Sequence, residues 1–248
     1  MSQLPDGVRV DTSTFEAAMN RFIALKRISL AEGLRLQAGL LADELVRDTP
    51  PQAGTVAGKS YGARKAGEAR VERDIRRAVR PLDPRKWTSD GMAELIRSKN
   101  HEALQKVFSR FSSLRIVPFS PRLHQEARDR EGRVRRETGR ATPDMAEHVA
   151  YVKRIKARVG LAKGGWAASQ KALGRRVQTW LTPHLRYGRL IDRTNQLEPS
   201  LTMLNESHWA GDRLAGIVVR KAMTRREGRM RRWIEGALAA QARKAGLA

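Results

Sequence analysis

Five histidines are the first residues in this sequence that could hold a metal ion or move a proton, and they stand at positions 101, 124, 148, 184 and 208. No two of them form an H-E-x-x-H or H-x-x-x-H pair, and the chain has no cysteine to complete a zinc site. A G-x-S-x-G turn is absent, and so is any cysteine nucleophile. The sequence therefore predicts neither a zinc site nor a nucleophilic centre.

Two stretches suggest phosphate or nuclease chemistry, but neither has the required spacing. The run Gly160–Gly165 lacks the G-x-x-x-x-G-K-[ST] spacing and follows a helical pattern, whereas a phosphate loop follows a strand. Asp144 and Glu147 are like the acidic pair of some nucleases, but the E-x-K spacing is absent and Asp144 fits better as a helix cap. Asp129 and Glu131 lie among arginines, with which they would pair. We expect no enzyme activity, no metal and no cofactor, and a nuclease is the weakest alternative.

The net charge of +23 is unevenly distributed and implies a polyanionic partner or an acidic protein surface. Residues 1–58 hold six Lys/Arg and seven Asp/Glu, so the excess lies in the remainder of the chain. Arginines on a C-terminal helix could contact phosphates, pair with acidic neighbours in an assembly, or form a solvated face. Few aromatics accompany them, which argues against base stacking on single strands. The candidate partner or phosphate contacts are Arg225, Arg226, Arg229, Arg231, Arg232, Arg133, Arg135 and Arg136.

A helical pattern over 144–159 leads into the glycines that could position a core. Its apolar residues recur at three- and four-residue spacing, and Pro143 precedes it as a start signal. Glycine inside a helix costs about 1 kcal/mol relative to alanine, so a close neighbour is expected where several occur together. We predict a glycine-lined helix crossing with a tryptophan in the core, made by Gly160, Gly164, Gly165 and Trp166.

Apolar periodicity predicts a long N-terminal helix over 14–48 and a basic C-terminal helix over 212–245, with further helices at 67–82 and 89–111. Short strands are expected at 8–10, 114–119, 189–194 and 200–205, together forming a small antiparallel sheet. The sequence thus predicts a mostly helical α+β protein.

Two segments lack apolar periodicity. Residues 51–67 contain four glycines and are expected to form a mobile loop. Residues 120–142 contain seven arginines and little that is apolar, so we expect a solvated helical hairpin or an arm that orders on a partner, the former being favoured. The expected organisation is one domain made of 1–50, 51–67, 68–142 and 143–248.

The sequence shows no signal-peptide pattern at its start and no apolar run of the roughly 18 residues that a membrane-spanning helix needs. The absence of cysteine fits the cytosol or a particle assembled there. We expect a soluble protein with no membrane partner.

A block of residues in the second half of the chain resembles virion proteins of long-tailed bacteriophages, described as minor tail, tail-completion or head–tail joining (neck) components. The block is Tyr151, Ile155, Val159, Gly160, Ala162, Lys163, Gly165, Trp166, Trp180 and His184. Supporting matches are Thr49–Pro51, Gly67–Glu68, Val71, Asp74–Ile75 and Asn205–Ala210. The segment between Trp87 and Thr142 has no counterpart in the resemblance.

This resemblance implies a fold and an assembly. The long N-terminal and C-terminal helices would pack on the small antiparallel sheet, and copies would form an oligomeric ring at the neck or proximal tail. The partners would be copies of the chain and a connector or adaptor, tail terminator or tail tube, with genome DNA passing nearby. Localisation would be the virion, assembled in the host cytoplasm, with 51–67 and 120–142 at contacts between subunits. A basic DNA-binding architectural protein is the alternative.

Overall fold

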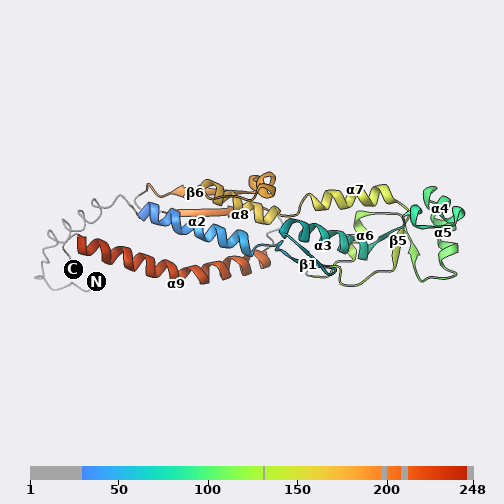
Figure 1. Cartoon of the computed structure of the whole chain (residues 1–248), viewed down its shortest axis with the longest axis horizontal. Helices are drawn as coiled ribbons and strands as arrows, with labels where there is room; N and C mark the ends of the chain where they lie inside the picture. Colours follow the sequence, from blue (N-terminus) through green and yellow to red (C-terminus); the bar gives the residue numbers. More distant parts are fainter. Residues whose placement is uncertain (1–29, 131, 197–199, 208–211, 245–248) are drawn as a thin grey trace, which may run out of the picture. The chain divides into compact units, whose positions relative to one another are not determined.

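The computed structural model describes residues 30–130, 132–196, 200–207 and 212–244, and it divides the chain into two compact units. The first combines the described residues of 1–49 with those of 162–248, and the second is Pro50–Leu161 (Figure 1). This differs from the single domain with a 68–142 insertion that we expected. The helix expected over 144–159 is α7 (Met145–Lys156). It packs on α3 (Ala63–Ala78), as α6 (Pro121–Glu126) does, so the second unit extends to Leu161.

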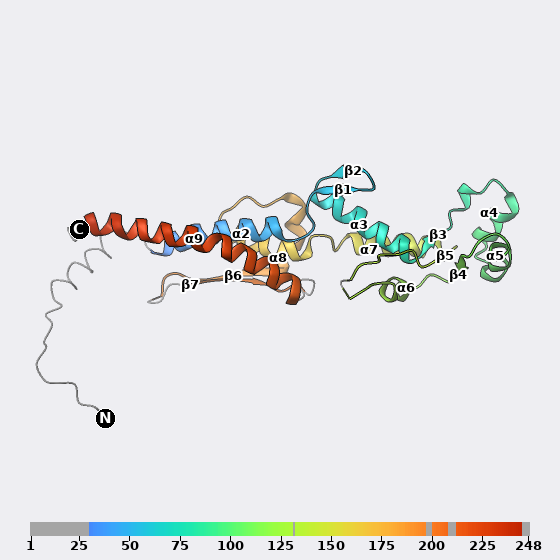
Figure 2. The ribbon, with the colours of Figure 1, turned by 90° about the horizontal axis from the view of Figure 1, so that it is seen from below.

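The first unit is built on two long helices that lie side by side. They are α2 (Leu30–Asp48) and α9 (Asp212–Lys244), and they run antiparallel because Gly33 meets Trp233 while Asp48 meets Arg225 (Figures 1 and 2). Between them in sequence come α8 (Leu161–Ala172), η2 (Thr179–Tyr187), β6 (Gly188–Arg193) and β7 (Ser200–Asn205).

Strands β6 and β7 pair antiparallel along their whole length, and α2 packs on β7 as well as on α9. The core contains Leu45, Val46, Trp166, Leu181 and Val218, so α2, α8, η2 and α9 all contribute to it. The expected mostly helical α+β fold, with long helices near both ends and a small antiparallel sheet, is confirmed.

The second unit has shorter elements and a three-stranded parallel sheet in the order β3-β5-β4. In chain order the elements are β1 (Gly54–Val56), β2 (Lys59–Tyr61), α3 (Ala63–Ala78), β3 (Arg80–Pro81), η1 (Pro84–Lys86), α4 (Asp90–Arg97), α5 (His101–Phe108), β4 (Arg115–Ile116), α6 (Pro121–Glu126), β5 (Arg140–Thr142) and α7 (Met145–Lys156). A core of Leu82, Ile96, Leu104, Phe108 and Ile116 joins α4 and α5 to the sheet.

The expected mobile loop at 51–67 is wrong, because its middle is a β-hairpin and its end is the start of α3. Strands β1 and β2 pair from Gly54 opposite Tyr61 to Val56 opposite Lys59. The two turn residues, Ala57 and Gly58, have φ values of 50° and 77°. Two consecutive positive φ angles match the twist of a tight hairpin, and Gly58 adopts one at no steric cost.

Two expectations about strands and helices are also corrected. The strand expected at 114–119 is only Arg115–Ile116, and it joins β5 in the parallel sheet of the second unit instead of β6 and β7. The helix expected at 89–111 is two helices, since Lys99 has a φ of 53° and the Asn100 side chain accepts a hydrogen bond from Ala103 N to begin α5. The strand expected at 8–10 lies outside the described residues.

The Arg-rich segment 120–142 is neither a solvated helical hairpin nor a free arm. It begins with the single helix α6, ends in the central strand β5, and packs on α3 in between. Val134 is buried, and Thr138 donates from its backbone N to Arg77 O (3.0 Å) and from its hydroxyl to Ala78 O. The segment folds because α3 supplies the apolar and hydrogen-bonding surface that its own composition lacks.

Candidate interaction surfaces

The glycines before Trp166 are approached closely, but by a hairpin and a 3₁₀ segment instead of a second helix. A Cβ atom on Gly164 would lie 2.3 Å from His184 Cβ, and one on Gly165 would lie 2.2 Å from Asn205 Oδ1. A Cβ on Gly188 would lie 1.9 Å from Gly165 O. These contacts place α8 directly against the start of β6 and the end of β7, with Trp166 buried behind them in the core.

Gly160 is buried and precedes α8. It has a φ of 95° and forms the turn between α7 and α8, so it is required for backbone conformation. Asn205 has a positioning role that was not predicted: its amide donates to Ala162 O (2.7 Å) and its Oδ1 accepts from Ser207. No spacing rule marks Asn205, because its partner lies 43 residues earlier in the chain.

The acids considered for nuclease chemistry are held by structural contacts in the second unit. Asp144 occupies the N-cap position of α7 without making a side-chain cap bond, which corrects the expected role. Its Oδ2 instead accepts from Phe119 N at 2.7 Å and lies 3.4 Å from His101 Nε2. The neighbouring Glu147 pairs with Lys99 at 2.7 Å, and this hydrogen bond lowers the pKa of Glu147.

Asp129 accepts hydrogen bonds from Arg133 N (2.9 Å) and Arg135 Nε (2.6 Å), in the pairing expected from the sequence. Glu131 lies outside the described residues. Across the described part of the chain, no group of three or more His, Cys, Asp or Glu is arranged to hold a metal ion. Asp129 closes a loop in this structure, since it ties together residues four and six positions later.

Two histidines in the second unit are buried among aromatic rings. His124 Nδ1 lies 2.9 Å from the Tyr151 hydroxyl, and Phe119 packs edge-on against His148. Burial, helped by the nearby Arg128, lowers the pKa of His124 from its ordinary value of 6.5 to about 4. Burial also lowers the pKa of His148. Both rings are therefore neutral near pH 7, and their site is part of the core.

Two of the predicted contact arginines are used inside the first unit. Arg225 pairs with Asp48 at 2.7 Å, and Arg226 lies 3.5 Å from Glu44. Arg226 and Glu44 are only 5% and 7% exposed, so this ion pair is buried between α9 and α2. Both arginines therefore have a carboxylate partner within the first unit, and Arg226 is buried with it. The sequence did not reveal the pairing because about 180 residues separate the partners.

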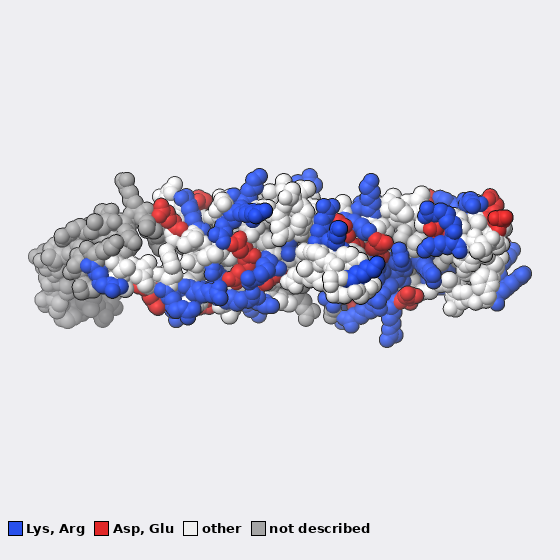
Figure 3. Space-filling view, viewed as in Figure 1, with Lys and Arg blue, Asp and Glu red and all other residues white. Residues whose placement is uncertain are grey.

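The other predicted arginines have mixed surroundings. Arg229, Arg231 and Arg232 are exposed on α9, and Arg231 makes a long exposed pair of 3.8 Å with Glu227. Arg133 and Arg135 are tied to Asp129, whereas Arg136 is exposed on the 127–139 loop of the second unit. Figure 3 shows Lys and Arg side chains along α9 and, separately, over the second unit. The structure therefore does not bring the predicted set together in one site.

The outer side of α9 carries large apolar side chains that the described residues leave exposed. Ile217 is 58%, Met223 48% and Ile234 37% exposed. Met223, Met230 and Ile234 are spaced by seven and four residues, so they share one side of the helix. They line a surface groove of about 620 Å³ together with Glu227, Arg231 and Glu235. We call Met223, Met230 and Ile234 the α9 stripe.

No family model, no curated protein and no solved structure matches this chain. Among the described residues, no helix is both long enough and apolar enough to cross a membrane.

Proposed function

We propose that this chain is a structural component of a tailed-phage virion, at the head–tail junction or proximal tail, that works by assembling with copies of itself and with other virion proteins. The resemblance of the block around Gly160–Trp166 motivates the proposal. Much of that block forms the packing of α8 against η2 and the hairpin, which is a structural role. The observation that carries an assembly function is the α9 stripe, in which Met223 and Ile234 are exposed and Met230 is half-buried.

The α9 stripe has the composition of a protein contact surface. Burying a Met or Ile side chain stabilises a complex by about 1.5–3 kcal/mol, so leaving such side chains in water forgoes that free energy unless a partner covers them. Glu227, Arg231 and Glu235 beside the stripe supply charges of both signs, as the polar rim of an interface does. Duplex DNA would gain little from the apolar side chains, and Arg225 and Arg226 already pair with α2.

The test is incorporation of a stripe variant, Met223→Glu with Ile234→Glu, into density-purified particles, quantified by mass spectrometry against the major capsid protein. We expect the unmodified chain at a handful to a few dozen copies per particle and the variant to be strongly depleted. The matched control is Thr224→Glu with Ala239→Glu, which adds the same charge at exposed positions of α9 outside the stripe.

Two outcomes would overturn parts of this proposal. Absence of the unmodified chain from particles, with the protein present in the infected-cell lysate, would remove the virion role. Normal incorporation of a folded stripe variant would keep the virion role but remove the α9 stripe as its contact surface.

A further inference from the structure

The second unit contains a concave basic site whose described lining includes none of the arginines proposed from the sequence. Its volume is about 460 Å³, and it is formed where α3 ends beside β3, η1 and β5. Its exposed lining is mostly polar. The residues that line it are Arg76, Arg77, Arg80, Pro81, Asp83, Lys86, Leu114, Glu137, Gly139, Arg140 and Met145. We call it the β3–β5 pocket.

The starts of the parallel strands supply positive charge to this pocket, through Arg80 and Arg140 in its lining. Each of the three strands begins with arginine, namely Arg80 in β3, Arg115 in β4 and Arg140 in β5. Because the strands are parallel, their first residues share an edge. Arg115 pairs with Arg140 in the register and Arg80 pairs with Ala141, while Arg115 itself lies outside the pocket lining. Like charges facing each other on neighbouring strands are destabilising unless an anion lies between or beside them.

Carboxylates of the described chain neutralise only part of this charge. Arg140 pairs with Glu126 at 3.2 Å, and Arg76 shares Glu72 with Lys156. Arg80, Lys86 and Arg115 form no ion pair with any described carboxylate.

The other charged side chains that line the pocket do not cancel its excess positive charge. The Asp83 carboxylate accepts hydrogen bonds from the backbone N and from the guanidinium of Arg85. These bonds lower the pKa of Asp83 and pair its charge with that of Arg85. Arg77 donates to the carbonyls of Val134 and Arg135 and also interacts with the Asp74 carboxylate, which it shares with Arg73, Arg128 and Arg133. Glu137 is the acidic side chain of the lining that is left to oppose these cations.

We propose that the β3–β5 pocket binds phosphate groups of a nucleic-acid backbone. Arginine presents forked donors that match phosphate oxygens, and several cations at one edge can meet successive phosphates of a strand. The described residues of the lining include no aromatic side chain on which a base could stack, so binding would be independent of base sequence. An acidic protein surface fits less well, because the cores of protein interfaces are depleted in charged residues.

This inference does not depend on the proposed virion role. The test is fluorescence anisotropy of a labelled short DNA duplex with the purified full-length protein over a salt series. Each neutralised phosphate contributes about −0.9 to the slope of log K against log salt. We expect the variant Arg80→Gln with Lys86→Gln to bind more weakly than the unmodified chain and to lose about two contacts, flattening the slope by about 1.8.

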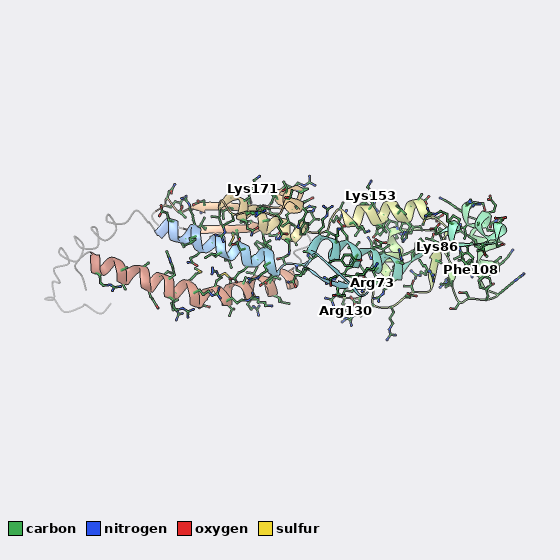
Figure 4. The ribbon with its side chains drawn as sticks, viewed as in Figure 1. Arg73, Lys86, Phe108, Arg130, Lys153 and Lys171 are labelled. Atoms are coloured by element: carbon green, nitrogen blue, oxygen red, sulfur yellow. The ribbon has the colours of Figure 1, made fainter. Side chains whose placement is uncertain are left out.

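The matched control is Lys153→Gln with Lys171→Gln, which removes two exposed lysines that form no ion pair with described residues and lie outside the pocket, on α7 and α8 (Figure 4). We expect the control to keep a slope close to that of the unmodified chain. Equal salt slopes for the two variants would overturn the pocket as the binding site and indicate a diffuse charge effect. Undetectable DNA binding at low salt would also overturn the proposal.

Two competitors distinguish the sources of the anion. Inorganic pyrophosphate that displaces DNA at equal phosphate concentration would point to a small phosphate ligand, and polyglutamate that binds as tightly as DNA would point to an acidic protein. Either result would overturn the assignment to a nucleic-acid backbone. We expect DNA binding by the unmodified chain to resist both competitors, and DNA binding by the variant Arg80→Gln with Lys86→Gln to be weaker.

Discussion

At the scale of single residues, Gly188 is where the first unit tolerates change least. The α-carbon has no room for a methyl group, because that group would lie 1.9 Å from the carbonyl oxygen of Gly165. The obstacle is backbone on another element, so no side-chain rotation can relieve it. We predict that Gly188→Ala lowers the free energy of unfolding by about 3 kcal/mol or more, measured by urea denaturation.

The matched substitution is Gly228→Ala, on the exposed side of α9, where an added Cβ meets nothing within 4 Å. Because alanine favours a helix interior over glycine, we expect this change to raise the free energy of unfolding by up to about 1 kcal/mol. Equal effects of the two substitutions would contradict the close approach of β6 to α8.

His124 predicts how the second unit responds to acid. Its pKa is lowered from 6.5 to about 4 on folding, so the unfolded chain binds more protons between these values. The contribution of His124 to the free energy of unfolding is therefore fully present above pH 6.5 and is lost as the pH falls toward 4. We expect the midpoint of thermal unfolding to fall across this window, and the fall to be smaller in His124→Leu.

The two proteins are compared by the slope of the unfolding midpoint against pH. Their absolute stabilities are not compared, because His124→Leu also removes the hydrogen bond to Tyr151. His148 has a lowered pKa as well, so part of the pH dependence should survive in the variant. An unchanged slope in His124→Leu would show that His124 is not the group that titrates.

At the scale of elements, a buried ion pair holds α9 to α2. Removing one partner of such a pair leaves the other charged and out of water, which typically costs about 3–5 kcal/mol. We predict a loss of this size for Arg226→Ala, because Arg226 and Glu44 are both buried. Arg231→Ala should change stability by less than about 0.5 kcal/mol, since its pair with Glu227 is long and exposed.

The double variant Arg226→Met with Glu44→Leu sharpens this test. Replacing both charges with apolar side chains leaves no unpaired buried charge, so it should destabilise less than Arg226→Ala alone. A larger loss in the double variant would mean that the two helices are held by packing that the substitutions disturb, and not by the ion pair.

At the scale of the whole molecule, the first unit is interrupted by the second at a point where its own two segments come close. Asp48, near the end of the first segment, lies close enough to Lys163 to raise the pKa of that lysine, although burial lowers it overall to about 8. The ends of the interruption, Thr49 and Ala162, are adjacent to these residues. A short connection could therefore replace the whole second unit.

We predict that a chain in which residues 50–161 are replaced by a short Gly/Ser linker retains the α2–α9 pair and unfolds cooperatively. Far-UV circular dichroism and urea denaturation measure this, and Arg226→Ala in the shortened chain is the control, since it should destabilise it as it does the full chain. A shortened chain without a cooperative transition would show that the first unit needs the second in order to fold.

The two units use their positive charge differently. Residues 50–161 carry 26 Lys/Arg and 13 Asp/Glu, which leaves a net charge of +13 in the second unit. In the first unit, Glu44 and Asp48 of the nearly neutral N-terminal region neutralise the two arginines at the centre of α9. The strand-start arginines of the second unit have fewer such partners, which is why the site that best fits phosphate lies there.

The sequence predicted much of the fold and little of the sites. Periodicity located α9, the described part of α2, α3 and α7, and turn residues located the β6–β7 strands, because these signals are local. Two-residue strands such as β3 and β4 have no period to detect. The β3–β5 pocket is invisible in sequence because Arg80 and Arg140, which line it, are 60 residues apart and come together only through the pairing of β3 with β5.

By itself the sequence determined the class of the molecule: a basic, mostly helical chain with a close backbone approach at Gly164 and Gly165. These properties follow from composition and from local steric rules that act within a few residues. Only the tertiary structure decided which neighbours fill that approach and which charges remain unpaired. Arg226 and Arg80 look alike in the sequence, yet one is buried against Glu44 while the other forms no ion pair with a described carboxylate, because the partners of a charge are set by long-range packing.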